Sequence, residues 1–416
     1  MASVGVFPRP PGDPAVKIGP VTDPVFPSPA ATAAGRAAAA PVRFTPVPLM
    51  DPKRVYPQWG PAAEESVLRI LRSHAYVKGE HVSGLETQFA AYVGVGHAVA
   101  VDSGTDALDL ILRAVFEDRP ADHREVILPS FTFVATAGAV VNAGGRPVFA
   151  DVKADTHNVD PDAVARLLSD RTAAVIPVHL FGSPADLPAV RAALDGRKVF
   201  VLEDAAQSIH ATLHGRRAGS LADAAAFSFY PSKNVGAAGD GGMVTTADER
   251  LAEIVASLRD HGQRRKLYDS DRVGTNSRMD EIQAAVLRHK LPLVDAWTRE
   301  RRQVAARYDA AFQGTAVLPQ RVIPGAQSAY HLYTVRVPHR DDVRADLQAR
   351  EIGCGVYYPL PLHRQTCFAR FHPDACPVSD RLATEALSLP CFPGLTREEQ
   401  DRVIAEVRAS LARRRA

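Results

Sequence analysis

The chain has 416 residues, 46% of them hydrophobic and 23% charged, which is enough to bury the cores of two domains. Its 49 basic and 47 acidic residues give a net charge of +2, which argues against a nucleic-acid binder held by phosphate contacts and against a disordered polyampholyte. Lysine occurs at only eight positions, so 41 of the basic residues are arginine. Chemistry that needs a lysine therefore has few candidates.

The first 50 residues are typical of an extension outside the folded domains. They hold 11 of the 32 prolines, and positions 31–40 are mostly alanine. Proline removes backbone donors and fixes φ, and this stretch offers almost no periodic apolar face to bury. We expect residues 1–50 to be disordered or loosely attached.

Alternating strand and helix patterns follow this extension. Short apolar runs predict buried strands, and spacings near 3.6 predict amphipathic helices. The predicted strands are 97–101, 125–128, 147–151, 172–178 and 199–202. The predicted helices are 62–71, 85–93, 106–115, 161–168 and 185–194. Such alternation indicates an α/β domain with a mostly parallel sheet covered on both faces, and we assign residues 51–290 to it.

The last part of the chain predicts a smaller C-terminal α+β domain, residues 291–416. Before it, still within the large domain, a strand is predicted at 243–246 and a helix at 249–259, and a long helical pattern from 280 to 312 leads into the small domain. Further elements are expected at 331–337, 343–350, 355–358 and 396–411. A long helix that joins two domains places a cleft between them, and ligands favour such clefts.

The cysteine content and the lack of long apolar runs predict a soluble protein in a reducing compartment. The four cysteines lie in the last quarter of the chain without a CxxC pair, so neither a disulfide framework nor a metal site is predicted. No apolar run approaches the roughly 20 residues that span a bilayer, and no secretory signal is evident. We expect a cytoplasmic protein with no membrane and no nucleic-acid partner.

Glu203 and Asp204 directly follow the apolar run 199–202 in the segment VFVLEDAAQ (199–207). A carboxylate there lies at the carboxyl end of a strand, where α/β sheets present ligands. The alternative is a structural acid that caps the next turn, and the segment alone favours neither.

Lys233 leaves a second apolar strand, in AFSFYPSKN, and enters a glycine-rich loop. A random lysine is usually a surface residue, but a lysine of lowered pKa forms Schiff bases with pyridoxal phosphate. That cofactor also needs an acid at its ring nitrogen and donors for its phosphate. The segment VDSGTDAL, in which a strand stops at Gly104 and a helix begins, suits the phosphate, although an ordinary helix cap looks the same.

With these motifs in order, the chain resembles the DegT-type sugar aminotransferases, pyridoxal-phosphate enzymes of the aspartate-aminotransferase fold (fold type I). The resemblance covers about residues 56–411. It rests on SGTDAL (103–108), PSFTFVATAGAV (129–140), EDAAQ (203–207), SFYPSKN (228–234), GDGG (239–242) and GTNSRMDEIQAAVL (274–287).

The resemblance implies a catalytic role for Lys233, which forms the Schiff base with pyridoxal phosphate and moves the proton during transamination. Asp204 then pairs with the ring nitrogen, and Gln207 lies near the phenolic oxygen. Phe133 stacks on the ring, although core packing is the simpler explanation for an aromatic residue in this motif.

The resemblance also implies how the phosphate is held. Its ligands are the amides of Gly104 and Thr105 and the hydroxyl of Ser228. Asn276 reaches the phosphate of a neighbouring subunit, so a homodimer with shared active sites is expected. The alternative for Asn276 is a turn residue after Gly274.

The reaction implied is transfer of an amino group from glutamate or glutamine to a keto-sugar, in antibiotic or glycan biosynthesis. Resemblance of segment 258–268 favours a nucleotide-linked 3-oxo sugar over a 4-oxo sugar. Alternatives are an inosose or another cyclic ketone as substrate, or a regulatory protein that keeps the fold without turnover. Substrate contacts are expected from Arg278, His331, Tyr358 and His363. Each has a structural alternative, such as an ion pair of Arg278 with Asp280 or Glu281.

Overall fold

The computed structural model describes residues 45–263, 269–371 and 373–414. Residues Phe44–Ala416 contact one another as one unit, and most of the expected extension lies outside the described residues. Its last residues, 45–50, are described: Val47 is buried and pairs in parallel with Ile352. These residues therefore pack on the folded part of the chain.

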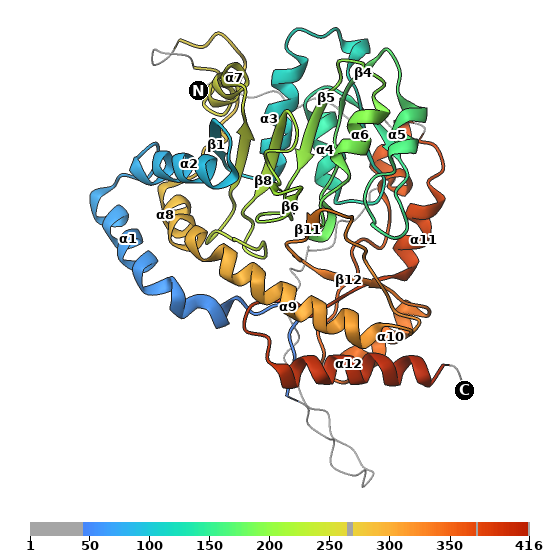
Figure 1. The fold of residues 1–416 in the computed structure, drawn as a ribbon. Coiled ribbons are helices and arrows are strands. Elements are labelled where there is room, and N and C mark those ends of the chain that lie inside the picture. The colour runs from blue at the N-terminus through green and yellow to red at the C-terminus, as the bar shows by residue number, and fades with distance from the viewer. Residues whose placement is uncertain (1–44, 264–268, 372, 415–416) are drawn as a thin grey trace, which may run out of the picture. The chain divides into compact units, whose positions relative to one another are not determined.

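A seven-stranded sheet in the order β1-β9-β8-β5-β4-β2-β3 is the centre of the fold (Figure 1). Its strands are β1 (His97–Val101), β2 (Glu125–Pro129), β3 (Arg146–Ala150), β4 (Thr172–Val175), β5 (Phe200–Asp204), β8 (Ala224–Ser228) and β9 (Gly242–Thr246). The pairs from β8 to β3 are parallel, and β9 runs antiparallel to both of its neighbours. The predicted α/β class with a mostly parallel sheet is confirmed.

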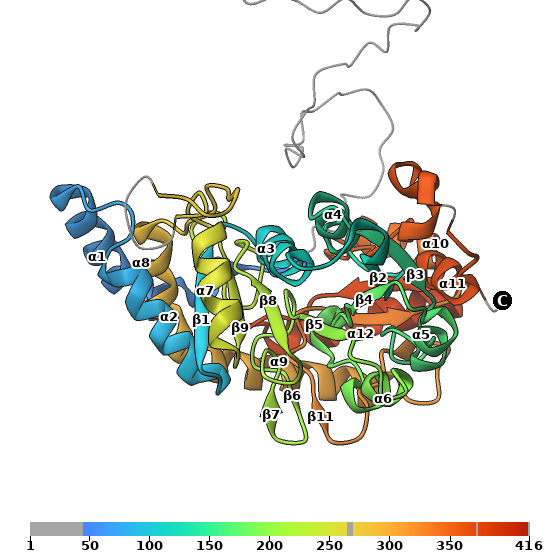
Figure 2. The same cartoon turned by 90° about the horizontal axis from the view of Figure 1, so that it is seen from above.

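Helices cover both faces of this sheet because alternate strand residues point to opposite sides (Figure 2). Val126 and Leu128 pack with α3 (Gly104–Phe116), α4 (Val134–Asn142) and α7 (Glu249–Leu258), whereas Ile127 faces the other side. That side is covered by α2 (Glu80–Val93), α5 (Pro161–Leu167), α6 (Leu187–Ala193) and α8 (Glu281–Lys290). α1 (Gly60–Ser73) packs beside α8.

The long helix predicted from 280 to 312 is wrong in one respect, because it is divided. α8 ends at Lys290, a 3-10 turn spans Leu291–Leu293, and α9 covers Val294–Phe312. Pro292 lies in this turn, where its missing N–H and its ring are incompatible with a continuous helix.

A second core lies around the latter half of α9. Tyr308 and Phe312 pack there against the sheet β10-β12-β13 and against α10 and α12. The elements are β10 (Leu318–Pro319), β12 (Tyr333–Arg336), α10 (Arg340–Ala349), α11 (Pro377–Glu385), β13 (Ala386–Leu389) and α12 (Arg397–Ala412). Gly355 forms only an isolated bridge to Ser388, so 355–358 is not a strand. The boundary between residues 290 and 291 stays a prediction.

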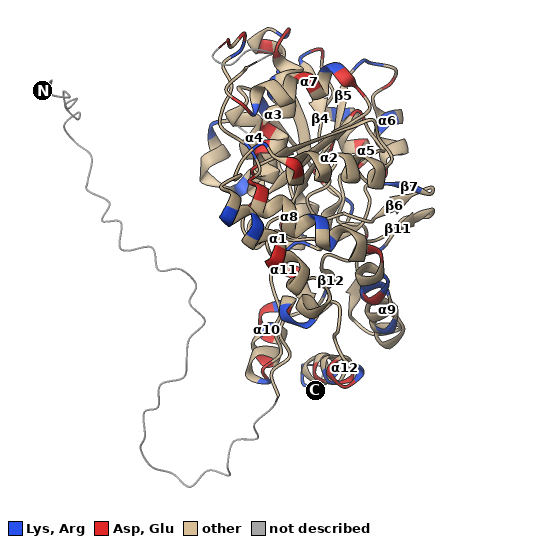
Figure 3. Cartoon of the chain, turned by 90° about the vertical axis from the view of Figure 1, so that its left-hand side faces the viewer, with Lys and Arg blue, Asp and Glu red and all other residues tan. Residues whose placement is uncertain are grey.

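A small third sheet pairs β11 (Ala326–Gln327) with β6 (Thr212–Leu213) and β7 (Arg216–Arg217). Basic and acidic residues are interspersed along α9, α10 and α12 (Figure 3). Across the described ranges, we find no helix with the length and apolarity that crossing a bilayer requires.

Candidate active site

Three strand ends meet at one edge of the large sheet. β1 and β8 are both antiparallel to β9, so they run in the same direction, and both Val101 and Ser228 pair with Gly242. β5 lies parallel to β8 and ends at Asp204. The carboxyl ends of β1, β5 and β8 therefore bring SGTDAL, EDAAQ and SFYPSKN together, as parallel strands predict.

The beginning of α3 forms a small cradle beside Ser228. A Cβ on Gly104 would lie 2.7 Å from the Cβ of Ser228, so only glycine allows this approach. The Ser103 hydroxyl accepts a hydrogen bond of 3.1 Å from the Asp106 amide and caps the helix. The first amides of a helix lack intrahelical partners and carry partial positive charge, which suits a phosphate group.

Asp204 is a buried carboxylate with few compensating donors. Its side chain accepts hydrogen bonds from the Thr136 hydroxyl at 2.8 Å and from the Ala206 amide at 3.2 Å. Burial raises the pKa of Asp204, against the opposing effects of these donors and of the Lys233 charge. A cationic partner at this carboxylate would offset the cost of burying it.

Glu203, the neighbouring acid, is structural. It is fully buried and accepts hydrogen bonds from the amides of Gly219, Leu221 and Ala222 at 2.7–2.9 Å. It also accepts one from His179 Nε2 at 2.8 Å. The sequence left open whether the EDAAQ motif has a structural acid or one that faces a ligand. Glu203 is the structural acid, and Asp204, at the end of β5, is the acid available to a ligand.

His179 was not found by sequence reasoning, since nothing in the motifs indicates it. Its Nδ1 accepts a 3.0 Å hydrogen bond from the Ala185 amide, so the proton lies on Nε2 and is donated to Glu203. Its backbone N–H donates to the Asp204 carbonyl at 3.1 Å. His179 therefore links the buried acid to the backbone of Asp204.

Lys233 lies in the turn after β8, where its amide donates to the Tyr230 carbonyl at 2.8 Å. Burial lowers the pKa of the Lys233 amine to about 8, although the negative charge of Asp204 acts in the opposite direction. A substantial fraction of the amine is therefore neutral near physiological pH, as a nucleophile or proton acceptor requires.

His331 lies close enough to Lys233 for the two charges to interact. The Asn234 amide nitrogen donates to the Ala329 carbonyl at 3.0 Å, so its oxygen faces His331 Nδ1 at 3.2 Å and accepts from it. Burial and the charges of Lys233 and Arg301 hold the pKa of His331 well below its ordinary value. The imidazole is therefore neutral, with its acceptor nitrogen at Nε2.

An aromatic wall stands beside these groups. Phe133 is 53% exposed, so the core-packing explanation for it is wrong; Phe131, two residues earlier, is the buried one. The Phe133 ring centroid lies 5.9 Å from that of Tyr358. Gln207 donates to the Tyr358 hydroxyl at 3.1 Å and accepts from the Phe181 amide at 2.6 Å, so its side chain is fixed.

The other predicted substrate residues have partners elsewhere. Arg278 pairs with Asp260, rather than with Asp280 or Glu281 as its structural alternative supposed. The Glu281 carboxylate instead accepts hydrogen bonds from backbone amides, including that of Gly79 at 2.7 Å.

His363 and Asn276 likewise have other neighbours. His363 Nδ1 lies 2.6 Å from the Ser130 hydroxyl, and its Nε2 lies 3.2 Å from Asp380. Asn276 is exposed and forms a backbone bridge with Asp260. The single chain thus does not test its expected role in a neighbouring subunit.

The topology of the sheet and the likeness to solved aminotransferases define the class: an aminotransferase of pyridoxal-phosphate fold type I. The chain belongs to the DegT/DnrJ/EryC1/StrS aminotransferase family, whose model matches residues 58–408. This confirms the family resemblance.

Two relatives and one solved structure are similar over nearly their whole length. The pleiotropic regulatory protein of Geobacillus stearothermophilus is 41% identical, over 87% of this chain and 97% of its own. The dTDP-3-amino-3,4,6-trideoxy-alpha-D-glucose transaminase of Streptomyces venezuelae is 41% identical, over 87% and 95%. The crystal structure of S. venezuelae DesV in complex with a ketimine intermediate has a TM-score of 0.84 at 40% identity, over 88% and 98%.

Proposed function

We propose that this sugar aminotransferase uses pyridoxal phosphate to move an amino group from glutamate or glutamine to a nucleotide-linked 3-oxo sugar. The observation that carries the proposal is the pair formed by the partly buried Lys233 and the buried Asp204 at the carboxyl edge of the sheet. The cradle of Gly104 and Ser228 and the wall of Phe133 stand at the same edge.

The residues present fit pyridoxal phosphate. Burial raises the pKa of the Asp204 carboxyl, and a protonated ring nitrogen beside it would stabilise its charged form. The Gly104 and Thr105 amides and the Ser228 hydroxyl would hold the phosphate, and Phe133 would cover the ring face. When bound, the cofactor withdraws electrons from the carbon that bears the transferred nitrogen, so that this carbon can lose and regain a proton.

The chain's own groups supply the proton movements. The Lys233 amine, with a pKa of about 8, takes a proton from the donor carbon and returns one to the sugar carbon. Gln207, held by the Phe181 amide, and Tyr358 form the fixed polar edge of the site. His331, neutral beside Lys233, does not add a second positive charge that would lower the lysine pKa further.

The substrate class is supported by the relatives and by two of the predicted contacts. The S. venezuelae relative is named as a transaminase that forms a 3-amino sugar linked to dTDP. Tyr358 accepts a hydrogen bond from Gln207, and His331 contacts Asn234, the residue after Lys233, so we propose both as sugar contacts. Antibiotic or glycan biosynthesis is the setting we propose. For Arg278 and His363 a substrate role remains a prediction.

A homodimer is part of the proposal because Asn276 is exposed and free to reach a second subunit. In the described residues, its recorded contact is the backbone bridge to Asp260. Sedimentation of the purified protein with and without pyridoxal phosphate measures the assembly, and loss of cofactor from Asn276→Ala in the dimer measures the role of the side chain.

The proposed function is tested by spectroscopy on the purified protein. The protein loaded with pyridoxal phosphate should absorb in the visible, and glutamate or glutamine should remove this band by forming the pyridoxamine form. A panel of nucleotide-linked 3-oxo and 4-oxo sugars and inososes is then added to that form, and the substrate is the compound that restores the band. If only inososes restore the visible band, the substrate is an inosose and not a nucleotide-linked sugar. If neither glutamate nor glutamine changes the spectrum, transfer from these donors is refuted.

A further inference from the structure

A cavity adjoins Lys233, and part of its lining comes from residues 50–59. It has a volume of about 60 Å³, and its lining includes Lys233, Lys290, Arg301 and Trp59. One water needs roughly 10–15 Å³ of such space, so the cavity has room for a group of the size of a carboxylate.

The lining of this cavity is rich in hydrogen-bond donors and positive charge. Arg301 is 6% exposed, and one of its terminal nitrogens donates to the carbonyls of Tyr330, His331 and Cys391. Its Nε is buried without a hydrogen-bond partner, and so is the Trp59 indole N–H. Buried polar groups nearly always find partners, so each of these two lining residues keeps a donor unused in the described part of the chain.

Lys290 adds a second cation, and none of the carboxylates in the described ranges forms an ion pair with it. Its ammonium group lies 4.0 Å from the centre of the Trp59 ring and donates to the Gly236 carbonyl. Burial alone lowers its pKa to about 8, with no acidic neighbour acting against that shift. Burying an unpaired charge is costly, and an anion in the cavity would offset that cost.

The acid in the lining, Asp51, is already engaged. Its carboxylate lies 3.2 Å from the Arg54 guanidinium and accepts from the Lys53 amide at 3.2 Å, which caps the 3-10 helix Pro52–Gln58. The charge of Asp51 is therefore directed to Arg54 and to the helix end. The side chains that line the cavity therefore carry a net positive charge.

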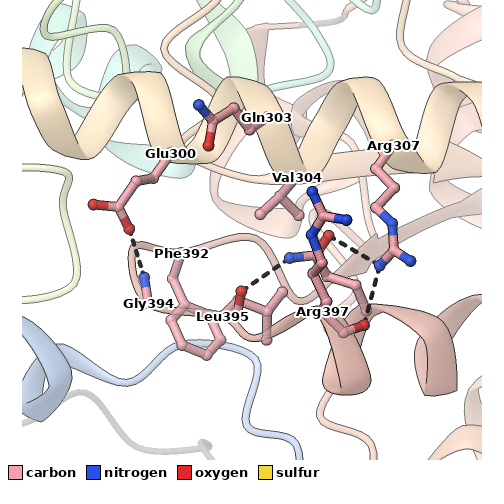
Figure 4. A pocket seen from close by; sticks show the side chains of 9 residues that line it. Glu300, Gln303, Val304, Arg307, Phe392, Gly394, Leu395 and Arg397 are labelled. Atoms are coloured by element: carbon pink, nitrogen blue, oxygen red, sulfur yellow. Dashed lines mark hydrogen bonds between the residues drawn. The ribbon is translucent and has the colours of Figure 1, made fainter.

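A larger pocket of about 360 Å³, which Phe392 also lines, lacks these properties (Figure 4). Its polar groups satisfy one another: Glu300 accepts from the Gly394 amide at 2.8 Å, and Gln400 donates to the Leu395 carbonyl at 2.9 Å. Arg307 pairs with Asp401. Lys233 does not line it, so it serves as the control for the cavity beside the lysine.

We propose that the cavity lined by Lys233, Lys290, Arg301 and Trp59 binds the α-carboxylate of the amino-acid donor. The inference rests on the proposed function, in which Lys233 takes a proton from the donor's α-carbon. The α-carboxylate is bonded directly to this carbon, so it must lie close to Lys233. Glutamate and glutamine share this group, so the cavity selects α-amino acids over simple amines. Because a keto-sugar has no carboxylate at this place, the cavity serves only one half of the reaction.

The test separates the two half-reactions in the loaded enzyme. Lys290→Met keeps an apolar stem on Trp59 and removes the charge, and Lys290→Arg keeps the charge. Single-turnover rates with glutamate or glutamine should show at least tenfold weaker donor binding in Lys290→Met and smaller loss in Lys290→Arg. The keto-sugar half-reaction should change less than twofold, and Arg397→Gln, in the larger pocket, should change neither.

A binding measurement makes the result independent of turnover. Calorimetry with glutarate, which has carboxylates and no amino group, should show tenfold weaker binding to Lys290→Met than to the wild type and to Arg397→Gln. Equal glutarate binding by all three proteins would overturn the carboxylate site. Equal loss in both half-reactions, with loss of cofactor, would also overturn it, because Lys290 would then act only by supporting the Gly236 loop. If the wild type binds glutarate but moves no amino group, the proposed function fails and the cavity assignment stands.

Discussion

Because burial lowers the pKa of Lys233, we expect this lysine to destabilise the cofactor-free protein. Its pKa is about 8 in the folded protein against 10.5 for an ordinary lysine, because burial disfavours the charged form. At about 1.4 kcal/mol for each pKa unit, the difference corresponds to about 3 kcal/mol. Lys233→Met in cofactor-free protein should therefore raise the free energy of unfolding at pH 7 by up to about 3 kcal/mol.

The sign of the pH dependence follows from proton linkage. Since the folded-state pKa lies below the unfolded value, the unfolded chain binds more protons between pH 8 and 10.5. Wild-type stability thus rises with pH across this window, and the destabilisation is fully present below pH 8. The advantage of Lys233→Met should accordingly shrink as the pH approaches 10.5.

Urea unfolding of cofactor-free wild type and variant at pH 7, 8.5 and 9.5 measures this difference. The matched control is Lys198→Met, which alters an exposed lysine and should change stability by less than about 0.5 kcal/mol. An advantage that grows with pH, or none at pH 7, would refute the argument that burial dominates the environment of Lys233.

Two further predictions concern the frame of the site. Gly104→Ala places a Cβ 2.7 Å from that of Ser228, so this variant should bind pyridoxal phosphate at least tenfold more weakly in a fluorescence titration. The control is Gly138→Ala, which has open space around the new Cβ and should bind the cofactor as the wild type does. Equal affinities of the two variants would argue against a phosphate site at Gly104. Glu203→Gln turns an amide N–H₂ toward backbone donors and should cost about 3 kcal/mol in urea unfolding, against less than about 1 kcal/mol for Glu385→Gln in a partly exposed ion pair. A loss for Glu203→Gln no larger than that of the control would show that the buried hydrogen bonds are not needed.

The sequence predicted the large sheet well because buried parallel strands are continuous apolar runs. The first strand was predicted at 97–101, as the structure has it, and the others are displaced by one to three residues at their ends. The C-terminal part was harder to predict. β13 is a four-residue strand that follows α11 directly, and its burial comes from β12 and Gly355 rather than from a local signal.

The site was predictable where motifs carry chemistry and not where packing decides. Lys233, Asp204 and Gln207 stand in ordered motifs, and the structure brings them to one sheet edge. His179 and Lys290 stand in no such motif, since their importance arises from a buried carboxylate and from an indole ring that lie far away in sequence. Only the folded chain shows these partners.

The position of β9 between β1 and β8 has a consequence for how the protein matures during synthesis. β1 pairs in the sheet with β9, whose residues follow it by more than 140 positions, so the start of α3 and Ser228 meet only after residue 246 has left the ribosome. Closing such a long loop is slow compared with forming local structure. A nascent chain that stops before β9 therefore has Lys233 but lacks the strand that joins the start of α3 to Ser228, and the large sheet is complete only after residue 246.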